Sequence, residues 1–96
     1  MIKIKQGFEI RTICGENLIV PLGKHNIDFS KVIYLNETSM FIWRLIEKGV
    51  NGVDEIVEAM TEVYDVERET CLNDVNEFLD SLIENNIIEK NNHVQN

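Results

Sequence analysis

The sequence has 96 residues, of which 44% are hydrophobic, so it has the length of one domain and a globular rather than a disordered composition. Its formal net charge is −8, and the acidic excess lies in residues 47–90, which contain three Lys or Arg and thirteen Asp or Glu, against six and four in residues 1–46. This charge argues against nucleic acid as a partner, because contacts between basic residues and phosphates supply most of the affinity of a nucleic-acid-binding protein.

The first part of the chain has the pattern of an antiparallel three-stranded meander. Residues 7–13 alternate apolar and polar side chains, as a half-buried strand does. Residues 15–17 are turn material, and residues 18–22 are predicted as the second strand. Pro21 is expected where pairing has ended, because proline has no N–H to donate to a ladder. Residues 27–35, after a short loop, are predicted as the third strand, and the short links favour pairing of consecutive strands.

The third strand leads directly into a predicted helix at residues 38–48. Asn36 and Thr38 lie at this corner, and an Asn or Thr just before an apolar-periodic run can accept a hydrogen bond from an unpaired backbone N–H at the helix start. The helix carries an apolar stripe widened by Trp43 and ends at Gly49, which suits the left-handed conformation at a helix C-terminus. We expect the rest of the domain to pack on this corner.

Two more helices are predicted, at residues 53–64 and 67–85, with Asp65 as a candidate cap. Each has an apolar stripe and an acidic, solvated face. The apolar positions are Val53, Ile56, Val57, Met60, Val63, Tyr64, Leu72, Val75, Phe78, Leu79, Leu82 and Ile83, followed by Ile87 and Ile88. We therefore predict one α+β domain over residues 1–89, a three-stranded antiparallel sheet followed by three helices in a winged helix-turn-helix-like arrangement, and a flexible polar tail at 90–96.

The sequence contains no arrangement of residues typical of catalysis or metal binding. His25 is predicted in a loop and His93 in the tail, and Cys14 and Cys71 are too far apart to form a CxxC pair. The many carboxylates fall on helix faces that are expected to be solvated, which does not favour a pair with shifted pKa values. We therefore predict a protein that is not an enzyme, carries no cofactor or metal, and binds a partner.

The expected location is the cytosol. No apolar run approaches the ~20 residues of a membrane span, and residues 1–5 lack the long apolar region of a secretory signal. We therefore expect no membrane partner, and we expect Cys14 and Cys71 to be reduced thiols.

The third strand is the predicted binding element. If residues 31–35 form a sheet edge, their unpaired N–H and C=O groups can accept an extended peptide as an added strand. Specificity would then come from pockets on the third helix. The candidate peptide-binding residues are Lys31, Val32, Ile33, Tyr34 and Leu35 on the strand, with Arg68, Cys71, Leu72, Val75 and Leu79 on the helix. For Leu72, Val75 and Leu79 a role in the core alone is an equal alternative, whereas Val32 and Tyr34 lie opposite the predicted core face.

Several short segments within residues 7–89 together carry a resemblance to a known family. They are Leu35-Asn36-Glu37-Thr38, Ile42-Trp43, Leu45-Ile46, Val53-Asp54-Glu55-Ile56-Val57, Tyr64-Asp65-Val66, Asp74-Val75, Phe78-Leu79, Leu82 and Ile87-Ile88. In this order they resemble the PqqD family, named for a small protein of pyrroloquinoline quinone biosynthesis. The sequence departs from the family pattern in the length of residues 23–28 and at Gly52, where a Ser or Thr cap is more usual.

The resemblance implies a peptide-recognition element that binds the leader of a ribosomally made precursor peptide. Such domains present the leader to a modifying enzyme, often a radical S-adenosylmethionine (SAM) protein. The leader is expected to add beside the third strand, in a groove against the third helix, which adds Asn76 to the candidate residues. Two other functions stay open: a winged-helix DNA-binding regulator that uses the third helix for recognition, and a structural module that forms a homodimer through its edge strands.

Overall fold

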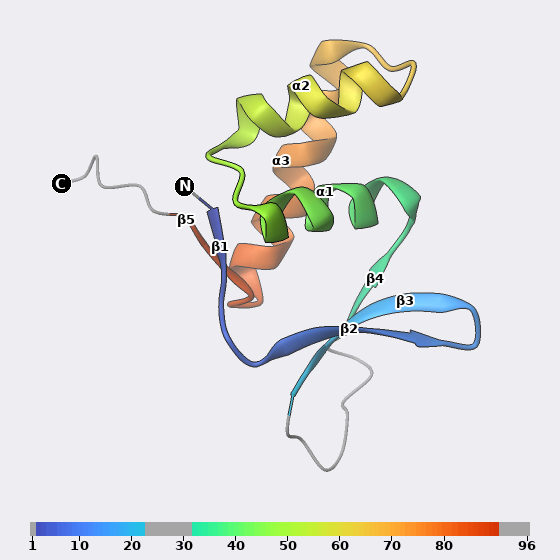
Figure 1. The fold of residues 1–96 in the computed structure, drawn as a ribbon, viewed down its shortest axis with the longest axis vertical. Helices are drawn as coiled ribbons and strands as arrows, with labels where there is room; N and C mark the ends of the chain where they lie inside the picture. The colour runs from blue at the N-terminus through green and yellow to red at the C-terminus, as the bar shows by residue number, and fades with distance from the viewer. Residues whose placement is uncertain (1, 23–31, 91–96) are drawn as a thin grey trace, which may run out of the picture.

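The computed structural model describes residues 2–22 and 32–90 (Figure 1). The elements in chain order are β1 (Ile2–Ile4), β2 (Phe8–Ile13), β3 (Glu16–Pro21), β4 (Ile33–Leu35), α1 (Glu37–Lys48), α2 (Val53–Val63), α3 (Arg68–Glu84) and β5 (Ile88–Lys90). Strands β2, β3 and β4 form an antiparallel sheet in that order, and the three helices follow. This confirms the predicted α+β, winged-helix-like fold. Predictions for residues 23–31 and 91–96, which include Lys31 and both histidines, lie outside the described residues.

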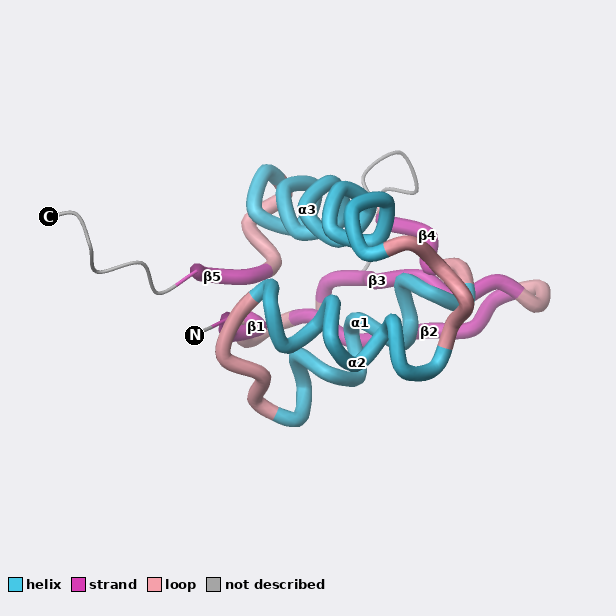
Figure 2. Tube along the Cα trace, turned by 90° about the horizontal axis from the view of Figure 1, so that it is seen from above, coloured by secondary structure: helices cyan, strands magenta, loops and turns pink. Residues whose placement is uncertain are grey.

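The helices pack around one core beside the sheet. Figure 1 shows α1 between α2 and the three-stranded sheet, and Figure 2 shows α3 along one side of α1 and α2. The buried core residues are Ile2, Ile19, Leu35, Ile42, Trp43, Ile46, Ile56, Val57, Met60, Cys71, Val75, Leu79, Leu82, Ile87 and Ile88. They come from both ends of the described chain, so the sheet and the helices are held as one body.

The corner between β4 and α1 has the predicted caps. The Asn36 side chain accepts a hydrogen bond from the Ser39 N–H at 2.9 Å and one from the Thr38 hydroxyl at 3.0 Å. At the other end of α1, Gly49 has φ of 97°, in the left-handed region where glycine is favoured. Trp43 is only 1% exposed. These features confirm the predicted corner, although the helix begins one residue earlier than expected.

The hairpin turn between β2 and β3 lies earlier than the sequence suggested. Ile13 pairs with Glu16, which leaves a two-residue loop of Cys14 and Gly15 with φ values of 53° and 79°. Positive φ at both central residues gives the loop a twist that matches the flanking strands. The prediction of a turn at residues 15–17 is therefore right at Gly15 and wrong at Glu16 and Asn17, which pair with Ile13 and Thr12 in the ladder.

Pro21 is the last residue of β3 and lies opposite Phe8 of β2. The Leu22 N–H donates to the Gly7 carbonyl at 2.7 Å, so pairing with β2 continues beyond the proline. Because successive residues direct their N–H groups to opposite sides of a strand, the missing N–H of Pro21 lies on the β4 side. The described pairs with β4 end at Ile19. The prediction that pairing ends near Pro21 is thus wrong for β2, and on the β4 side the residue opposite Pro21 lies outside the described residues.

A second, two-stranded sheet, which was not predicted from the sequence, joins the two ends of the described chain. Ile2 of β1 pairs with Lys90 of β5 in an antiparallel ladder, and the Lys5 N–H extends it by donating to the Ile87 carbonyl at 2.8 Å. Ile2 and Ile88 are each 2% exposed. The expected burial of Ile88 is confirmed, but it is buried as part of a strand.

The starts of α2 and α3 have no side-chain cap of the usual kind. Gly52 is the N-cap residue of α2, and nearby the Glu55 carboxylate accepts hydrogen bonds from the backbone and side-chain N–H groups of Asn51 at 3.2 and 3.1 Å. At α3 the N-cap residue is Glu67. The prediction that Asp65 caps α3 is wrong, because α3 begins at Arg68, two residues later than that cap would place it.

The buried stripes of α2 and α3 are narrower than predicted. Ile56, Val57 and Met60 are buried on α2, whereas Val63 is 61% exposed. On α3 the buried residues are Cys71, Val75, Leu79 and Leu82. Leu72 and Ile83 are 36% and 37% exposed, so these two residues and Val63 were wrongly assigned to the buried stripes. None of the described helices is both long and apolar enough to cross a membrane.

Candidate functional site

Strand β4 forms one edge of the three-stranded sheet. It pairs with β3 through Asn17 and Leu35, Leu18 and Tyr34, and Ile19 and Ile33. Within residues 2–22 and 32–90, no strand pairs with its other side. That side therefore presents backbone N–H and C=O groups that a further strand could complete.

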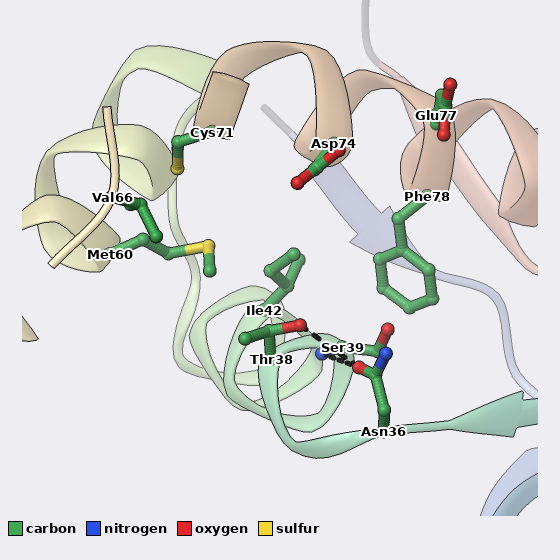
Figure 3. Close-up of a pocket in the computed structure, with 10 residues that line it drawn as sticks. All are labelled: Asn36, Thr38, Ser39, Ile42, Met60, Val66, Cys71, Asp74, Glu77 and Phe78. Atoms are coloured by element: carbon green, nitrogen blue, oxygen red, sulfur yellow. Dashed lines mark hydrogen bonds between the residues drawn. The ribbon is translucent and has the colours of Figure 1, made fainter. Parts of the chain in front are cut away.

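A cleft of about 450 Å³ opens at the end of this edge, between the start of α1 and one face of α3 (Figure 3). It is lined by Asn36, Thr38, Ser39, Ile42, Met60, Val66, Cys71, Asp74, Glu77 and Phe78. The first three follow β4 directly in the chain. The free strand edge and the cleft are therefore next to each other.

The walls of the cleft differ in chemistry from one end to the other. In Figure 3, Met60, Val66 and Cys71 gather at one end, and Phe78 lies towards the other. Asp74 points from α3 into the space above Ile42. The cleft thus combines an apolar compartment with a carboxylate, and binding sites commonly combine apolar walls with a few polar groups.

The predicted strand residues lie at the edge as expected, with Lys31 outside the described residues. Leu35 is 6% exposed and Ile33 is partly buried, and both contact the core. Tyr34 is 56% exposed, so it lies on the opposite face. Val32 is partly buried.

The predicted helix residues divide into three groups. Of the six, Cys71 alone lines the cleft. Val75 and Leu79 are 0% exposed in the core, so their burial supports the core alternative. Leu72, Arg68 and Asn76 lie outside the cleft lining: Leu72 is 36% exposed, and Arg68 pairs with Glu58 at 3.2 Å.

The sequence analysis missed the α3 residues Asp74, Glu77 and Phe78. It placed the groove along the apolar positions 72, 75 and 79, whereas the cleft follows Cys71, Asp74 and Phe78. These three are spaced i, i+3 and i+7, so they share one helix face beside the core stripe. A carboxylate between a cysteine and an aromatic residue on one face was the available signal, but both carboxylates were read as solvated surface.

The carboxylates of the cleft have no cationic partner among the described residues. The ion pairs there join Arg11 to Glu9, Arg44 to Glu47 and Arg68 to Glu58. Asp74 and Glu77 belong to none of them, and both are exposed. The cleft wall formed by α3 is therefore negatively charged.

Cys71 is not suited to nucleophilic chemistry. Burial raises the pKa of its thiol, the nearby Asp74 carboxylate raises it further, and Arg68 opposes the shift. The thiol is therefore protonated at neutral pH, whereas reactive cysteines have lowered pKa values. In the described part of the chain, no group of three or more His, Cys, Asp or Glu side chains is arranged to hold a metal ion.

Tyr64 fixes the position of the α1 start relative to α2. Its hydroxyl donates to Glu37 at 3.3 Å, and its ring meets Phe41 edge-on at a centroid distance of 5.5 Å. Partial burial of the Tyr64 hydroxyl, together with the charge of Glu37, raises its pKa. These contacts hold the cap of α1 in place beside the cleft.

Comparison with known proteins identifies the family. The sequence profile of the PqqD family, described as coenzyme PQQ synthesis protein D, matches residues 16–88. The structure of TbiB1 in complex with the TbiA(beta) leader peptide is similar, with 28% sequence identity, a TM-score of 0.71, and coverage of 91% of this chain and 94% of TbiB1. Lasso peptide synthetase B1 complexed with its leader peptide shares the fold at 17% identity, a TM-score of 0.72, and coverage of 92% and 96%. No match was found among curated proteins. Because the profile covers well over half of the sequence, the chain belongs to the PqqD family.

Proposed function

We propose that this protein is a non-catalytic peptide-binding chaperone for a ribosomally made precursor peptide. It binds the leader by strand addition at β4 and presents the precursor to a modifying enzyme. The observation that carries the proposal is the open edge of β4 with the cleft directly beside it. It is supported by the similarity to TbiB1, a protein whose structure was solved with a leader peptide bound.

Backbone pairing at β4 is too limited to hold a peptide by itself. The strand has three residues, so about two to four hydrogen bonds can form on its open side. At a net ~1 kcal/mol each, these bonds contribute roughly 2–4 kcal/mol. A dissociation constant of about 1 mM already corresponds to −4.1 kcal/mol. Useful affinity therefore requires that guest side chains also enter the cleft.

The proposed contacts are therefore of two kinds: backbone pairing along β4 and side-chain contacts in the cleft. Val32, Ile33, Tyr34 and Leu35 provide the backbone edge, and Lys31 would extend it. On α3, Cys71 lines the cleft directly. Arg68, Leu72 and Asn76 could meet the guest only beyond the cleft, and Val75 and Leu79 would act from the core behind it.

The enzyme partner and the location are also part of the proposal. A radical SAM enzyme as the modifying partner fits the family resemblance. A cytoplasmic location is proposed because a ribosomally made precursor is first available there. A homodimer formed through two β4 edges would compete with the guest for the same groups.

The direct test is a titration of the full chain with the precursor peptide encoded beside its gene, followed by two-dimensional NMR. We expect saturable binding, with the largest shifts at residues 32–36 and on the Cys71 to Phe78 face of α3. Light scattering over a range of concentrations tests the homodimer in the same samples. Absence of binding, with the modifying enzyme either present or absent, would contradict the proposed function.

A further inference from the structure

The cleft beside β4 combines an apolar compartment with carboxylates that have no cationic partner among the described residues. We propose that it selects guest peptides that carry an apolar side chain and a Lys or Arg on the same face of the added strand, with the cation bound by Asp74 and Glu77. This inference rests on the proposed function and names the chemistry of its substrate. The occupant is a basic, extended peptide segment.

The apolar compartment provides the anchor for one side chain. Met60, Val66 and Cys71 form it, and Ile42 lies at its base (Figure 3). Met60 is only 5% exposed and Cys71 3%, so the core fixes their positions, whereas Val66 is 42% exposed and open to contact with a guest.

The carboxylates supply the charge selection. Asp74 points into the cleft, and Glu77 lies farther along α3 (Figure 3). The basic residue of α3, Arg68, is already paired with Glu58 at 3.2 Å. Farther along α3, Asp80 and Glu84 add negative charge. A cation on the guest is therefore attracted, and an acidic guest is repelled.

The strand geometry restricts where the two guest residues lie. Side chains of a strand point alternately to its two faces. An apolar residue and a basic residue that both enter the cleft must therefore be separated by an even number of positions. This spacing rule distinguishes selection in the cleft from a general attraction between a basic peptide and an acidic protein, which has no preferred register.

The test is an mRNA-display selection of randomised 15-residue peptides on the immobilised full chain. The wild type is compared with the double variant Asp74→Asn, Glu77→Gln and with the matched control Asp80→Asn, Glu84→Gln. The control removes the same charge from the same helix but outside the cleft. We expect the wild type and the control to enrich Lys or Arg at an even spacing from an apolar residue, and the cleft variant to keep only the apolar preference.

The dissociation constant of the best peptide is then measured by fluorescence anisotropy, together with its Lys→Gln or Arg→Gln analogue. Loss of the guest cation is expected to weaken binding to the wild type by roughly two- to fivefold for each carboxylate it contacts. The same change should have no effect on binding to the cleft variant, as a double-mutant cycle requires for a direct pair. Matching thermal melts of all variants show that the fold is intact.

The outcomes separate this inference from the proposed function. If peptides bind without a basic preference, or if the preference survives in the cleft variant, the charge selection is overturned and peptide binding stands. If no peptide is enriched and the precursor does not bind either, the charge selection and the proposed peptide-binding function are both overturned. An enrichment of basic residues at odd and even spacings alike also contradicts the inference, because it indicates attraction without register.

Discussion

Trp43 is the largest fully buried side chain and anchors α1 in the core. It is 1% exposed, and its indole N–H donates to the Glu47 carboxylate at 3.1 Å. We expect Trp43→Ala to lower the free energy of unfolding by about 3–5 kcal/mol, the usual cost of removing a large buried aromatic ring. Urea denaturation measures this loss. Small domains have a total stability of roughly 5–15 kcal/mol, so this change should remove a large share of it.

Val63→Ala is the matched control for this prediction. Val63 is 61% exposed on α2, and such surface changes usually alter stability by less than about 0.5 kcal/mol. A Trp43→Ala variant as stable as this control would show that the ring does not carry the core.

Cys71 reports on the charge of Asp74. Burial is the main cause of its raised pKa, and the Asp74 carboxylate is the next. Replacing Asp74 by Asn removes that negative charge, so we expect the thiol pKa to fall and the thiolate fraction at fixed pH to rise. Mass-spectrometric measurement of iodoacetamide labelling between pH 7 and 9 should show faster modification of Cys71 in Asp74→Asn. Unchanged labelling would mean that Asp74 does not act on the cleft thiol.

Cys14 serves as the internal reference for that measurement. It lies exposed in the β2–β3 turn, far along the chain from the cleft residues. Its rate of labelling should be the same in both proteins. An equal change at both cysteines would indicate a global effect, such as partial unfolding, rather than the local charge.

At the scale of the element, β4 is the strand whose backbone is predicted to bind the guest. We expect Val32→Pro to weaken peptide binding by at least tenfold, because it removes a donor and bends the edge. The neighbouring variant Ile33→Pro is the control, since adjacent residues direct their N–H groups to opposite sides of a strand. Ile33→Pro should lower the stability of the fold, because it removes an N–H that pairs β4 with β3. Titration calorimetry and thermal melts of both variants measure the two effects, and an unfolded Val32→Pro with an intact Ile33→Pro would reverse the assignment.

β1 and β5 extend the core beyond the sheet that carries the site. Ile2 is 2% exposed between α1 and β5, although it stands next to the chain start. We expect Ile2→Ala to lower the free energy of unfolding by about 2–5 kcal/mol, as for a residue in the core. A residue in a frayed end would cost far less. Lys3→Ala, at the exposed neighbouring position, should be nearly neutral. Equal urea-unfolding midpoints for Ile2→Ala and Lys3→Ala would show that β1 does not hold the two ends of the described chain together.

The elements that depend on neighbouring residues were predictable from sequence, and those that depend on distant ones were not. Asn36 and Gly49 mark the ends of α1 through local backbone chemistry, and the structure confirms both. The β1–β5 ladder joins residues far apart in the chain, and strands of three residues carry too little periodicity to be recognised. The cleft position was missed for a related reason: which face of α3 opens beside the core is decided by how α3 packs against α2 and β5.

At the scale of the whole molecule, charge separates this chain from the DNA-binding proteins that share a winged-helix shape. Architecture alone does not assign function. In a DNA-binding winged helix α3 would approach the phosphates, yet its exposed residues include Asp74, Glu77, Asp80 and Glu84. Each of these carboxylates would repel the phosphate backbone of DNA, and the formal net charge of −8 adds to the repulsion.

We therefore expect no binding of the full chain to a random-sequence 30-base-pair duplex at 50 mM salt, where phosphate contacts are strongest. Fluorescence anisotropy with protein up to about 100 μM is the measurement, because non-specific DNA binding typically has dissociation constants of 10⁻⁴–10⁻⁶ M at physiological salt and tightens below it. Binding that weakens steeply as salt rises would revive the DNA-binding function. If the duplex fails to bind while the leader peptide does, the acidic face of α3 serves peptide recognition, and the winged-helix shape is retained for the open edge of β4 rather than for a recognition helix.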